Sequence, residues 1–183
     1  MESISASDKI AWFLGLMEGD GHISNGKNYD YKISVCLDSE ILAKNTSIVI
    51  NDIFSIMPKI YKYKNKKCYE VYFRSKNIWE KLKDFKVPSE SKLNFIGGLI
   101  DAEGHVEVAG YRIIIPMKSD TTADEVFRIL EEFNFMPKKR NDGWWRIYIY
   151  GKKNLQKILP YISHPKKIDS IVQILNSSTR KRV

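Results

Sequence analysis

The chain has no long apolar run and only two cysteines. No stretch of its 183 residues approaches the roughly 20 apolar residues that span a bilayer. The first residues also lack the basic start and apolar segment of a signal peptide. Cys36 and Cys68 match no metal-binding spacing and are too few for a disulfide framework. We therefore expect no membrane association and a reducing, intracellular setting, in the cytoplasm or an organelle.

Acidic residues are outnumbered, with 22 Asp and Glu against 30 Lys and Arg and a net charge of +8. The excess is concentrated in two segments, residues 59–67 and 138–140, and the first of these also contains two tyrosines. Basic residues mixed with tyrosines suit nucleic acid, although a solvated cationic face gives the same composition. The sequence shows no glycine-rich phosphate loop, zinc-ligand spacing or Ser-His-Asp order.

Two short segments are near copies of each other: FLGLMEGDG at residues 13–21 and IGGLIDAEG at residues 96–104. Each ends in a carboxylate followed by glycine, and these carboxylates, Asp20 and Glu103, lie 83 residues apart. Further pairs of similar segments follow at slowly shrinking offsets, such as MPK at 57–59 and 136–138. A long period that occurs only twice indicates a duplication and not a solenoid. We predict two halves, residues 1–87 and 88–183.

Each half has the pattern of one unit with the order αββαββα. The motif helices should begin near Ser7 or Asp8 and near Ser89 or Ser91, and end at left-handed C-caps on Gly21 and Gly104. Helices and hairpins in this order predict the α+β class with antiparallel sheets. The expected hairpins cover 22–38, 59–75, 105–118 and 137–150, and the expected amphipathic helices 39–55 and 121–133.

Residue alternation assigns two faces to each predicted sheet. Ile33, Val35 and Leu37 share an apolar face that helices would cover, and Lys32 and Ser34 lie on the other. A ribbon with Lys, Arg, Tyr and Ser on one face fits the major groove and can reach bases and phosphates. The expected DNA contacts, from these faces and from the basic segments and loops, are Tyr29, Lys32, Ser34, Lys62, Lys64, Tyr72, Arg74, Arg112, Lys139, Arg140, Arg146 and Tyr148.

The motif helices carry small residues at i, i+4 spacing, namely Gly15 with Gly19 and Gly98 with Ala102. Such spacing lets one helix backbone approach another closely, which would offset the roughly 1 kcal/mol that each glycine costs a helix.

Asp20 and Glu103 fall at the negative ends of these helices, where a carboxylate is disfavoured. Two such acids side by side would repel each other unless a cation lay between them. Oxygen ligands without a His or Cys cluster favour Mg²⁺, to which the last-turn carbonyls of Gly19 and Ala102 could also bind. A metal between carboxylates and phosphate is the usual arrangement for phosphodiester hydrolysis.

The paired segments resemble the LAGLIDADG motif of homing endonucleases, specifically the single-chain, pseudo-symmetric members, and the resemblance covers nearly the whole chain. It implies that the motif helices join the halves and that two saddle-shaped sheets bind the major groove of a long, asymmetric double-stranded DNA site. It also implies a monomer in which Asp20 and Glu103 bind the catalytic Mg²⁺, or Mn²⁺ or Ca²⁺ in its place. Each half would then cut one strand and leave short 3′ overhangs.

The resemblance also implies basic or polar residues around the metals. Lys118 matches the position at the end of the second strand, where the first half departs from the family with Asp38. Lys76 and Lys153 match the position after the fourth strand, where an ammonium group could orient water or stabilise the developing negative charge.

Two other functions remain open at this stage. The same scaffold could serve an RNA-binding intron maturase, in which RNA binding would survive replacement of the two acids. It could also serve a DNA-binding relative without catalysis. The sequence feature that points to this function is Asp38, which departs from the family pattern. The intact pair of acids favours cleavage.

Overall fold

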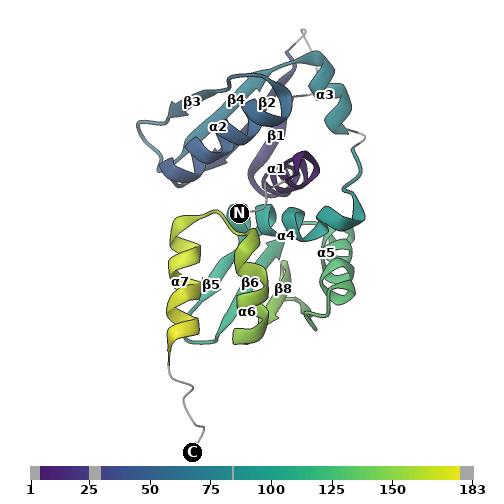
Figure 1. Cartoon of the computed structure of the whole chain (residues 1–183), viewed down its shortest axis with the longest axis vertical. Coiled ribbons are helices and arrows are strands. Elements are labelled where there is room, and N and C mark those ends of the chain that lie inside the picture. Colours follow the sequence, from purple (N-terminus) through teal and green to yellow (C-terminus); the bar gives the residue numbers. More distant parts are fainter. Residues whose placement is uncertain (1–4, 25–29, 84, 178–183) are drawn as a thin grey trace, which may run out of the picture. The chain divides into compact units, whose positions relative to one another are not determined.

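The computed structural model describes residues 5–24, 30–83 and 85–177, so the predicted DNA contact Tyr29 lies outside the described residues. The chain divides into two compact units, residues 1–103 and 104–183, which are described separately below (Figure 1). Among the described residues, no helix combines the length and apolar character needed to cross a bilayer.

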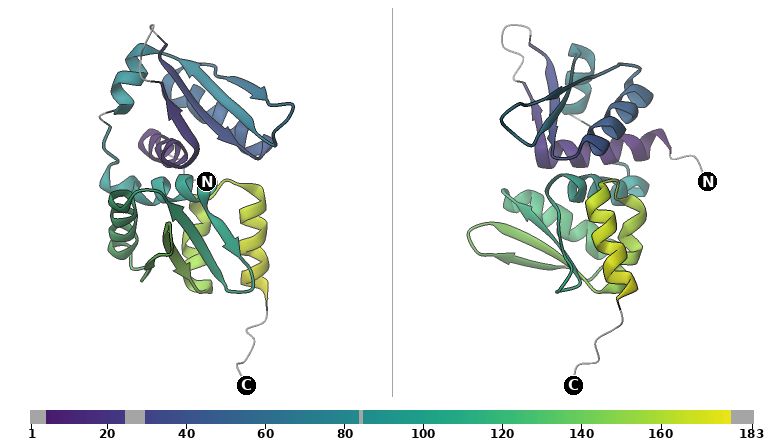
Figure 2. Two further views of the ribbon diagram at one scale, coloured as in Figure 1. Left: turned by 180° about the vertical axis from the view of Figure 1, so that it is seen from behind. Right: turned by 90° about the vertical axis from the view of Figure 1, so that its left-hand side faces the viewer.

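The first unit contains a four-stranded antiparallel sheet in the order β1-β2-β4-β3. Helix α2 contacts β2, β3 and β4, and the helices lie on one side of this sheet (Figure 2). Its elements in chain order are α1 (Ala6–Asp20), β1 (Gly21–Ile23), β2 (Lys32–Leu37), α2 (Glu40–Phe54), β3 (Lys59–Lys62), β4 (Tyr69–Arg74), α3 (Lys76–Lys83), a short 3₁₀ turn (Ser89–Ser91) and α4 (Lys92–Glu103).

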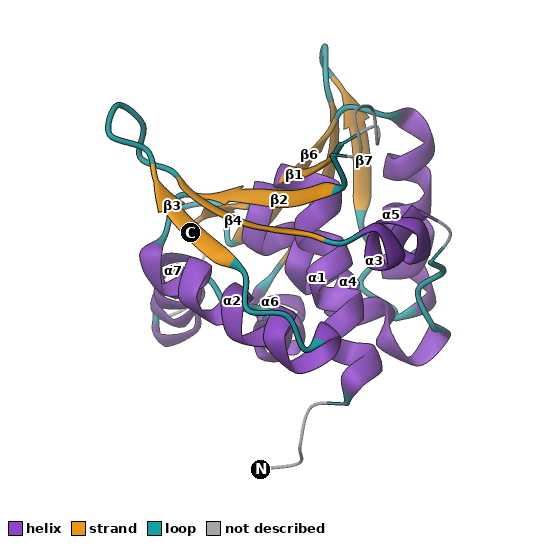
Figure 3. Ribbon diagram, turned by 90° about the horizontal axis from the view of Figure 1, so that it is seen from above, coloured by secondary structure: helices purple, strands orange, loops and turns teal. Residues whose placement is uncertain are grey.

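The second unit repeats the sheet, with the order β5-β6-β8-β7 and every neighbouring pair antiparallel. Strands β6 and β7 of this sheet are labelled in Figure 3. Its elements are β5 (His105–Glu107), β6 (Arg112–Met117), α5 (Asp120–Glu132), β7 (Lys138–Asn141), β8 (Trp145–Tyr150), α6 (Lys152–Ile158), a 3₁₀ turn (Leu159–Tyr161) and α7 (Pro165–Asn176). The predicted α+β class and antiparallel sheets are thus confirmed. The predicted boundary between residues 87 and 88 separates the two sequence repeats and not the two compact units. It stays a prediction.

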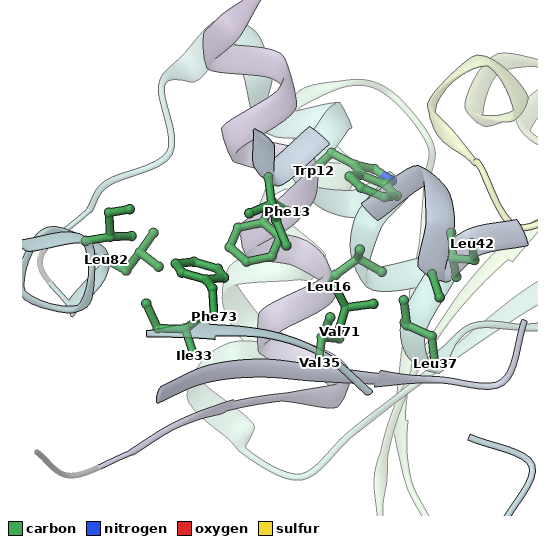
Figure 4. Close-up of a cluster of buried hydrophobic side chains, with 13 residues drawn as sticks. Trp12, Phe13, Leu16, Ile33, Val35, Leu37, Leu42, Val71, Phe73 and Leu82 are labelled. Atoms are coloured by element: carbon green, nitrogen blue, oxygen red, sulfur yellow. The ribbon is translucent and has the colours of Figure 1, made fainter. Parts of the chain in front are cut away.

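The core of the first unit lies between α1, α2 and the apolar face of the sheet (Figure 4). Ile33, Val35 and Leu37 alternate along β2 and are each at most 1% exposed. They meet Phe13 and Leu16 of α1. The strand alternation predicted from the sequence therefore gives the correct buried face, and the opposite face is left to polar side chains.

The predicted glycine C-caps are wrong in their backbone conformation. Gly21 follows α1 in an extended conformation, with φ −81° and ψ 154°, and Gly104 is not among the glycines with positive φ in the described part of the chain. Gly21 is required for space instead, because a Cβ there would lie 2.2 Å from the Met17 carbonyl oxygen. At the other end of α1, Ser5 caps the helix by accepting from the Asp8 amide, two or three residues before the predicted start.

Cys36 of β2 and Cys68, just before β4, form a disulfide with a Cα–Cα distance of 5.9 Å. This disulfide was not predicted from the sequence, in which two cysteines, 32 residues apart, are too few for a disulfide framework. Strand pairing brings them together, since Cys36 lies opposite Glu70, two residues after Cys68. The bond ties the lysine-rich turn between β3 and β4 to the central strand β2.

Reducing this disulfide is expected to lower the free energy of unfolding by about 2–4 kcal/mol, because the bond closes a loop of moderate length. Denaturant unfolding with and without a thiol reductant measures the difference. The Cys36→Ser/Cys68→Ser double variant is the control, and its unfolding should not respond to reductant. Identical curves for the oxidised and reduced wild type would contradict the stabilising role.

Candidate active site and nucleic-acid interface

The two motif helices α1 and α4 pack against each other through their glycines. A Cβ on Gly15 would lie 2.0 Å from the Phe95 carbonyl oxygen, and one on Gly98 would lie 1.9 Å from the Trp12 carbonyl oxygen. Both obstacles are backbone atoms, which cannot rotate away. The close approach predicted from the small-residue spacing is confirmed at this contact.

Two side-chain hydrogen bonds add links to α1, one from the 3₁₀ turn that directly precedes α4 and one from α4 itself. Ser91 Oγ donates to Asp8 Oδ1 at 2.8 Å, near the N-terminal ends of both helices. Trp12 Nε1 donates to Asp101 Oδ2 at 2.8 Å, and the Asp101 side chain is buried. The helices therefore run parallel, with their N-termini together and their C-termini together.

Replacing Trp12 with phenylalanine is expected to lower the free energy of unfolding by about 1.5–3 kcal/mol, because a buried carboxylate loses a hydrogen-bond donor. Chemical denaturation followed by circular dichroism measures this. Trp144→Phe is the matched control, since Trp144 is 51% exposed and its replacement should change stability by less than about 0.5 kcal/mol. Equal effects at the two positions would contradict a structural role for the Trp12–Asp101 bond.

The two motif acids emerge where the last turns of α1 and α4 touch. A Cβ on Gly19 would lie 2.6 Å from the Ala102 Cβ and 2.9 Å from the Glu103 Cγ. Asp20 and Glu103 are the final residues of their helices, and both are partly buried. Each helix end carries about half a negative charge in addition to its carboxylate. The parallel packing thus concentrates negative potential at one place.

This arrangement suits a hard divalent cation. Its donors are all oxygens, from two carboxylates and the last-turn carbonyls that lack helical partners, such as those of Gly19 and Ala102. Within the described ranges, no group of three or more His, Cys, Asp or Glu side chains could hold a metal ion. The remaining ligands of such a cation would have to be water or a bound phosphate, which is the situation that Mg²⁺ favours.

The strand ends near the first acid can be located from the strand register. Gly21, next to Asp20, pairs with Val35, so the C-terminal end of β2 and Asp38 lie at the same end of the sheet. Asp38 lines a surface cavity of about 550 Å³ together with lysines of the β3–β4 turn. In the second unit, Lys118 is exposed and directly follows β6, at the end where β5 begins.

The prediction that Lys76 and Lys153 surround the metals is not supported by the strand directions. Lys76 follows Arg74, which pairs with Lys32 at the start of β2. The Lys32–Arg74 pair lies about 10 Å along the strand from Val35, which pairs with Gly21 next to Asp20. Lys76 lies further still from Asp20. Lys153 likewise follows the residue that pairs with Arg112, so it lies at the opposite end of β6 from Lys118. The sequence matched a position after strand four but could not reveal which end of the sheet it occupies.

Most predicted DNA contacts do share the polar faces of the two sheets. In the first sheet, the register places Lys32, Ser34, Tyr72 and Arg74 together on the face opposite the core. In the second sheet, the corresponding face holds Arg112, Arg140, Arg146 and Tyr148.

Lys62 and Lys139 were predicted to contact DNA but do not lie on the polar faces, because the register puts both on the helix side of their sheets. Lys139 forms ion pairs with Asp120 and Asp124 of α5 and lies opposite the buried Ile147. Lys62 lies opposite Tyr69, with its ammonium 5.4 Å from the centre of that ring. Lys64 falls in the turn after β3 and is exposed.

Three further residues of the polar faces, Lys59, Lys138 and Tyr61, were not among the predicted DNA contacts. Lys59 pairs with Tyr72 and Lys138 pairs with Tyr148, at equivalent positions of the two halves. Tyr61 lies beside Glu70 on the first polar face. Extending the alternation from β4 to β3, and from β8 to β7, would have identified them.

The Glu70 carboxylate lies among cations on the first polar face. It accepts from Lys32 Nζ at 2.5 Å and from the Tyr63 hydroxyl at 3.1 Å. Burial raises the pKa of the Glu70 carboxyl, but the ion pair with Lys32 and the Tyr63 bond lower that pKa more, so it lies below its ordinary value. Glu70 is therefore charged at neutral pH, and it neutralises part of the face.

Comparison with known proteins agrees with this architecture. Residues 90–163 match the family model of the LAGLIDADG-like domain. I-DmoI in complex with DNA and Mn is 22% identical, covers 96% of this chain and 100% of its own, and has a TM-score of 0.62. Mesophilic variants of the homing endonuclease I-DmoI are 21% identical over 91% of this chain and 98% of theirs, with a TM-score of 0.72.

Residues 90–163 form a LAGLIDADG-like domain, and the chain as a whole has the LAGLIDADG fold. The fold extends over both halves, as the coverage of I-DmoI demonstrates. The same LAGLIDADG fold also occurs in full-length WhiA from Thermatoga maritima, which is 16% identical, with a TM-score of 0.70 over 97% of this chain and 63% of the WhiA chain. No curated protein sequence gives a significant match. I-DmoI has also been solved with Ca.

Proposed function

We propose that this protein is a site-specific double-strand DNA endonuclease of the intron homing type. The observation that carries the proposal is the pair of acids, Asp20 and Glu103, at the joined C-termini of two parallel helices. A carboxylate is disfavoured at the negative end of a helix, so the presence of one at this position in both copies calls for a functional reason. Binding of a divalent cation to phosphate provides one.

Asp20 and Glu103 would hold Mg²⁺, with Mn²⁺ or Ca²⁺ as substitutes, and the Gly19 and Ala102 carbonyls would complete the oxygen donors. When bound, the metal lowers the pKa of its water and neutralises charge on the phosphate. Each half would direct one acid to one strand, so a monomer would make both cuts and leave short 3′ overhangs. The ammonium of Lys118 would stabilise negative charge in the second half, where Asp38 in the first half could not.

The polar faces of the two sheets would bind the major groove of a long, asymmetric DNA site inside the cell. Their cations and tyrosines can reach phosphates and base edges, as double-stranded DNA recognition requires. The net charge of +8 adds a sequence-independent attraction to the polyanion.

Cleavage of a randomised double-stranded DNA library tests the proposal. The wild-type protein should enrich a long cut sequence in Mg²⁺ and cut nothing in excess EDTA. Cutting in EDTA would contradict the metal mechanism, and failure to cut any sequence with each of the three metals would contradict the endonuclease. RNA binding by a protein that cuts no DNA would instead favour the maturase function.

A further inference from the structure

The two halves place one cation each at the same position of the sheet. Lys32 begins β2 and Arg112 begins β6, and both lie on the polar face. Each cation lies over an equivalent tyrosine of the neighbouring strand. Lys32 Nζ is 4.8 Å from the centre of the Tyr72 ring, and Arg112 Cζ is 5.5 Å from that of Tyr148. The duplication has therefore kept the contact between cation and ring.

Each of these cations is also held by a carboxylate, but the carboxylate comes from a different strand in each half. Glu70 of β4 binds Lys32 Nζ at 2.5 Å. Glu107 of β5 accepts from Arg112 Nη2 at 2.6 Å and from Arg112 Nε at 3.0 Å. The two halves thus have a cation at the same position but hold it with acids from different strands. This indicates that a cation held in place is the feature that the duplication has retained.

These pairs are better shielded than other ion pairs of the same faces. The Lys32 and Glu70 side chains are 25% and 14% exposed, and those of Arg112 and Glu107 are 30% and 33% exposed. In contrast, the Arg74 and Asp30 side chains are 60% and 46% exposed. Arg74 Cζ also lies 5.8 Å from the centre of the Tyr72 ring, so ring contact does not set it apart. The greater shielding of the Lys32 and Arg112 pairs restricts the rotamers of these two side chains more than that of Arg74.

A fixed, partly neutralised cation is poorly suited to binding phosphate. Phosphate contacts gain from full positive charge and tolerate mobile side chains, and a neighbouring carboxylate weakens them. Reading a base edge requires donors in a set place, and the common partners of Lys and Arg there are the O6 and N7 acceptors of guanine. Lys32 has donors beyond the one directed at Glu70, and the Arg112 guanidinium has five N–H donors, of which Glu107 takes two.

We infer that Lys32 and Arg112 are base-discriminating residues, each directed at a guanine of its own half-site, with Glu70 and Glu107 as the residues that position them. This inference rests on the proposed binding of double-stranded DNA and extends it to the base that each half prefers.

A binding selection from a randomised double-stranded DNA library, without added divalent metal, tests the inference. The wild-type protein should enrich guanine at a defined position in each half-site. Lys32→Met should abolish the preference at one position, and Glu70→Gln should weaken it by about 5- to 100-fold at that same position. Arg112→Met and Glu107→Gln should do the same at a position in the other half-site.

Affinity for DNA of unrelated sequence separates this role from a structural one. Glu70→Gln and Glu107→Gln remove a negative charge from a DNA-facing surface, so this affinity should stay equal or rise while discrimination falls. Glu40→Gln is the matched control, because Glu40 pairs with Lys44 on the helix side and its loss should change no base preference. Thermal unfolding confirms that each variant is folded.

The possible outcomes separate the inference from the proposed function. A wild-type protein that enriches no sequence, or Lys32→Met and Arg112→Met variants with unchanged base preference, would overturn the inference. Effects of Glu70→Gln at a position other than that of Lys32→Met would overturn the positioning role. A protein with the expected preferences that cuts none of the selected sequences would support the inference and contradict the endonuclease.

Discussion

Replacing Gly98 with alanine is expected to lower the free energy of unfolding by about 2–4 kcal/mol, although alanine favours helices over glycine by about 1 kcal/mol. The new methyl group would lie 1.9 Å from the Trp12 carbonyl oxygen, 2.9 Å from the Trp12 carbonyl carbon and 3.0 Å from the Leu16 amide nitrogen. All three atoms are backbone, so α1 and α4 would have to separate. Separation removes contacts along the whole pair of helices.

Denaturant unfolding compares the Gly98→Ala variant with the wild type. Gly15→Ala should have an effect of similar size, because its Cβ would lie 2.0 Å from the Phe95 carbonyl oxygen. Asn45→Ala is the control, since Asn45 is exposed on α2 and alanine there should be neutral or mildly stabilising. A Gly98→Ala variant that gains the roughly 1 kcal/mol of helix propensity would show that the helices are not tightly packed.

Asp20→Asn and Glu103→Gln are each expected to slow cleavage by more than about 100-fold, because even residues that only support metal ligands commonly cost 10- to 100-fold. The free energy of unfolding of these variants should not fall together with their activity. Each variant removes a negative charge from the negative end of a helix, where a carboxylate is disfavoured by about 0.3–1 kcal/mol. DNA affinity should be unchanged or higher for the same electrostatic reason.

Single-turnover cleavage of the selected site, with unfolding and binding measured on the same preparations, tests this combination. Glu18→Gln is the matched control, because Glu18 is exposed one residue before Gly19 and the variant makes the same charge change in the same helix. If the Asp20→Asn/Glu103→Gln double variant cuts as fast as the wild type, the metal mechanism is wrong. If it is inactive because it is unfolded, the acids are structural.

Much of the fold could be predicted because the relevant signals are local. The alternation of Ile33, Val35 and Leu37 gave the buried face of β2, and the glycines at i, i+4 spacing gave the contact of α1 with α4. The motif acids could also be singled out as candidate site residues, since two copies of a nine-residue pattern are informative without any structure.

The errors concern properties that depend on distant parts of the chain. Lys139 was assigned to the DNA face because a basic run does not reveal which of its residues points to which side, and pairing with β8 decides this. Lys76 was placed near the metals because the sequence does not tell which end of a strand lies near Asp20. Cys36 and Cys68 meet only through the pairing of β2 with β4, which their spacing does not encode.

The parallel packing of α1 and α4 also bears on how the protein is made. Both acids, and every residue that links the two motif helices, lie within the first 103 residues. Because a chain folds from its N-terminus while it is being synthesised, the pair of carboxylates can be assembled while the second sheet is still being translated. A cation bound at the two acids would then stabilise the nascent first unit before the second sheet exists.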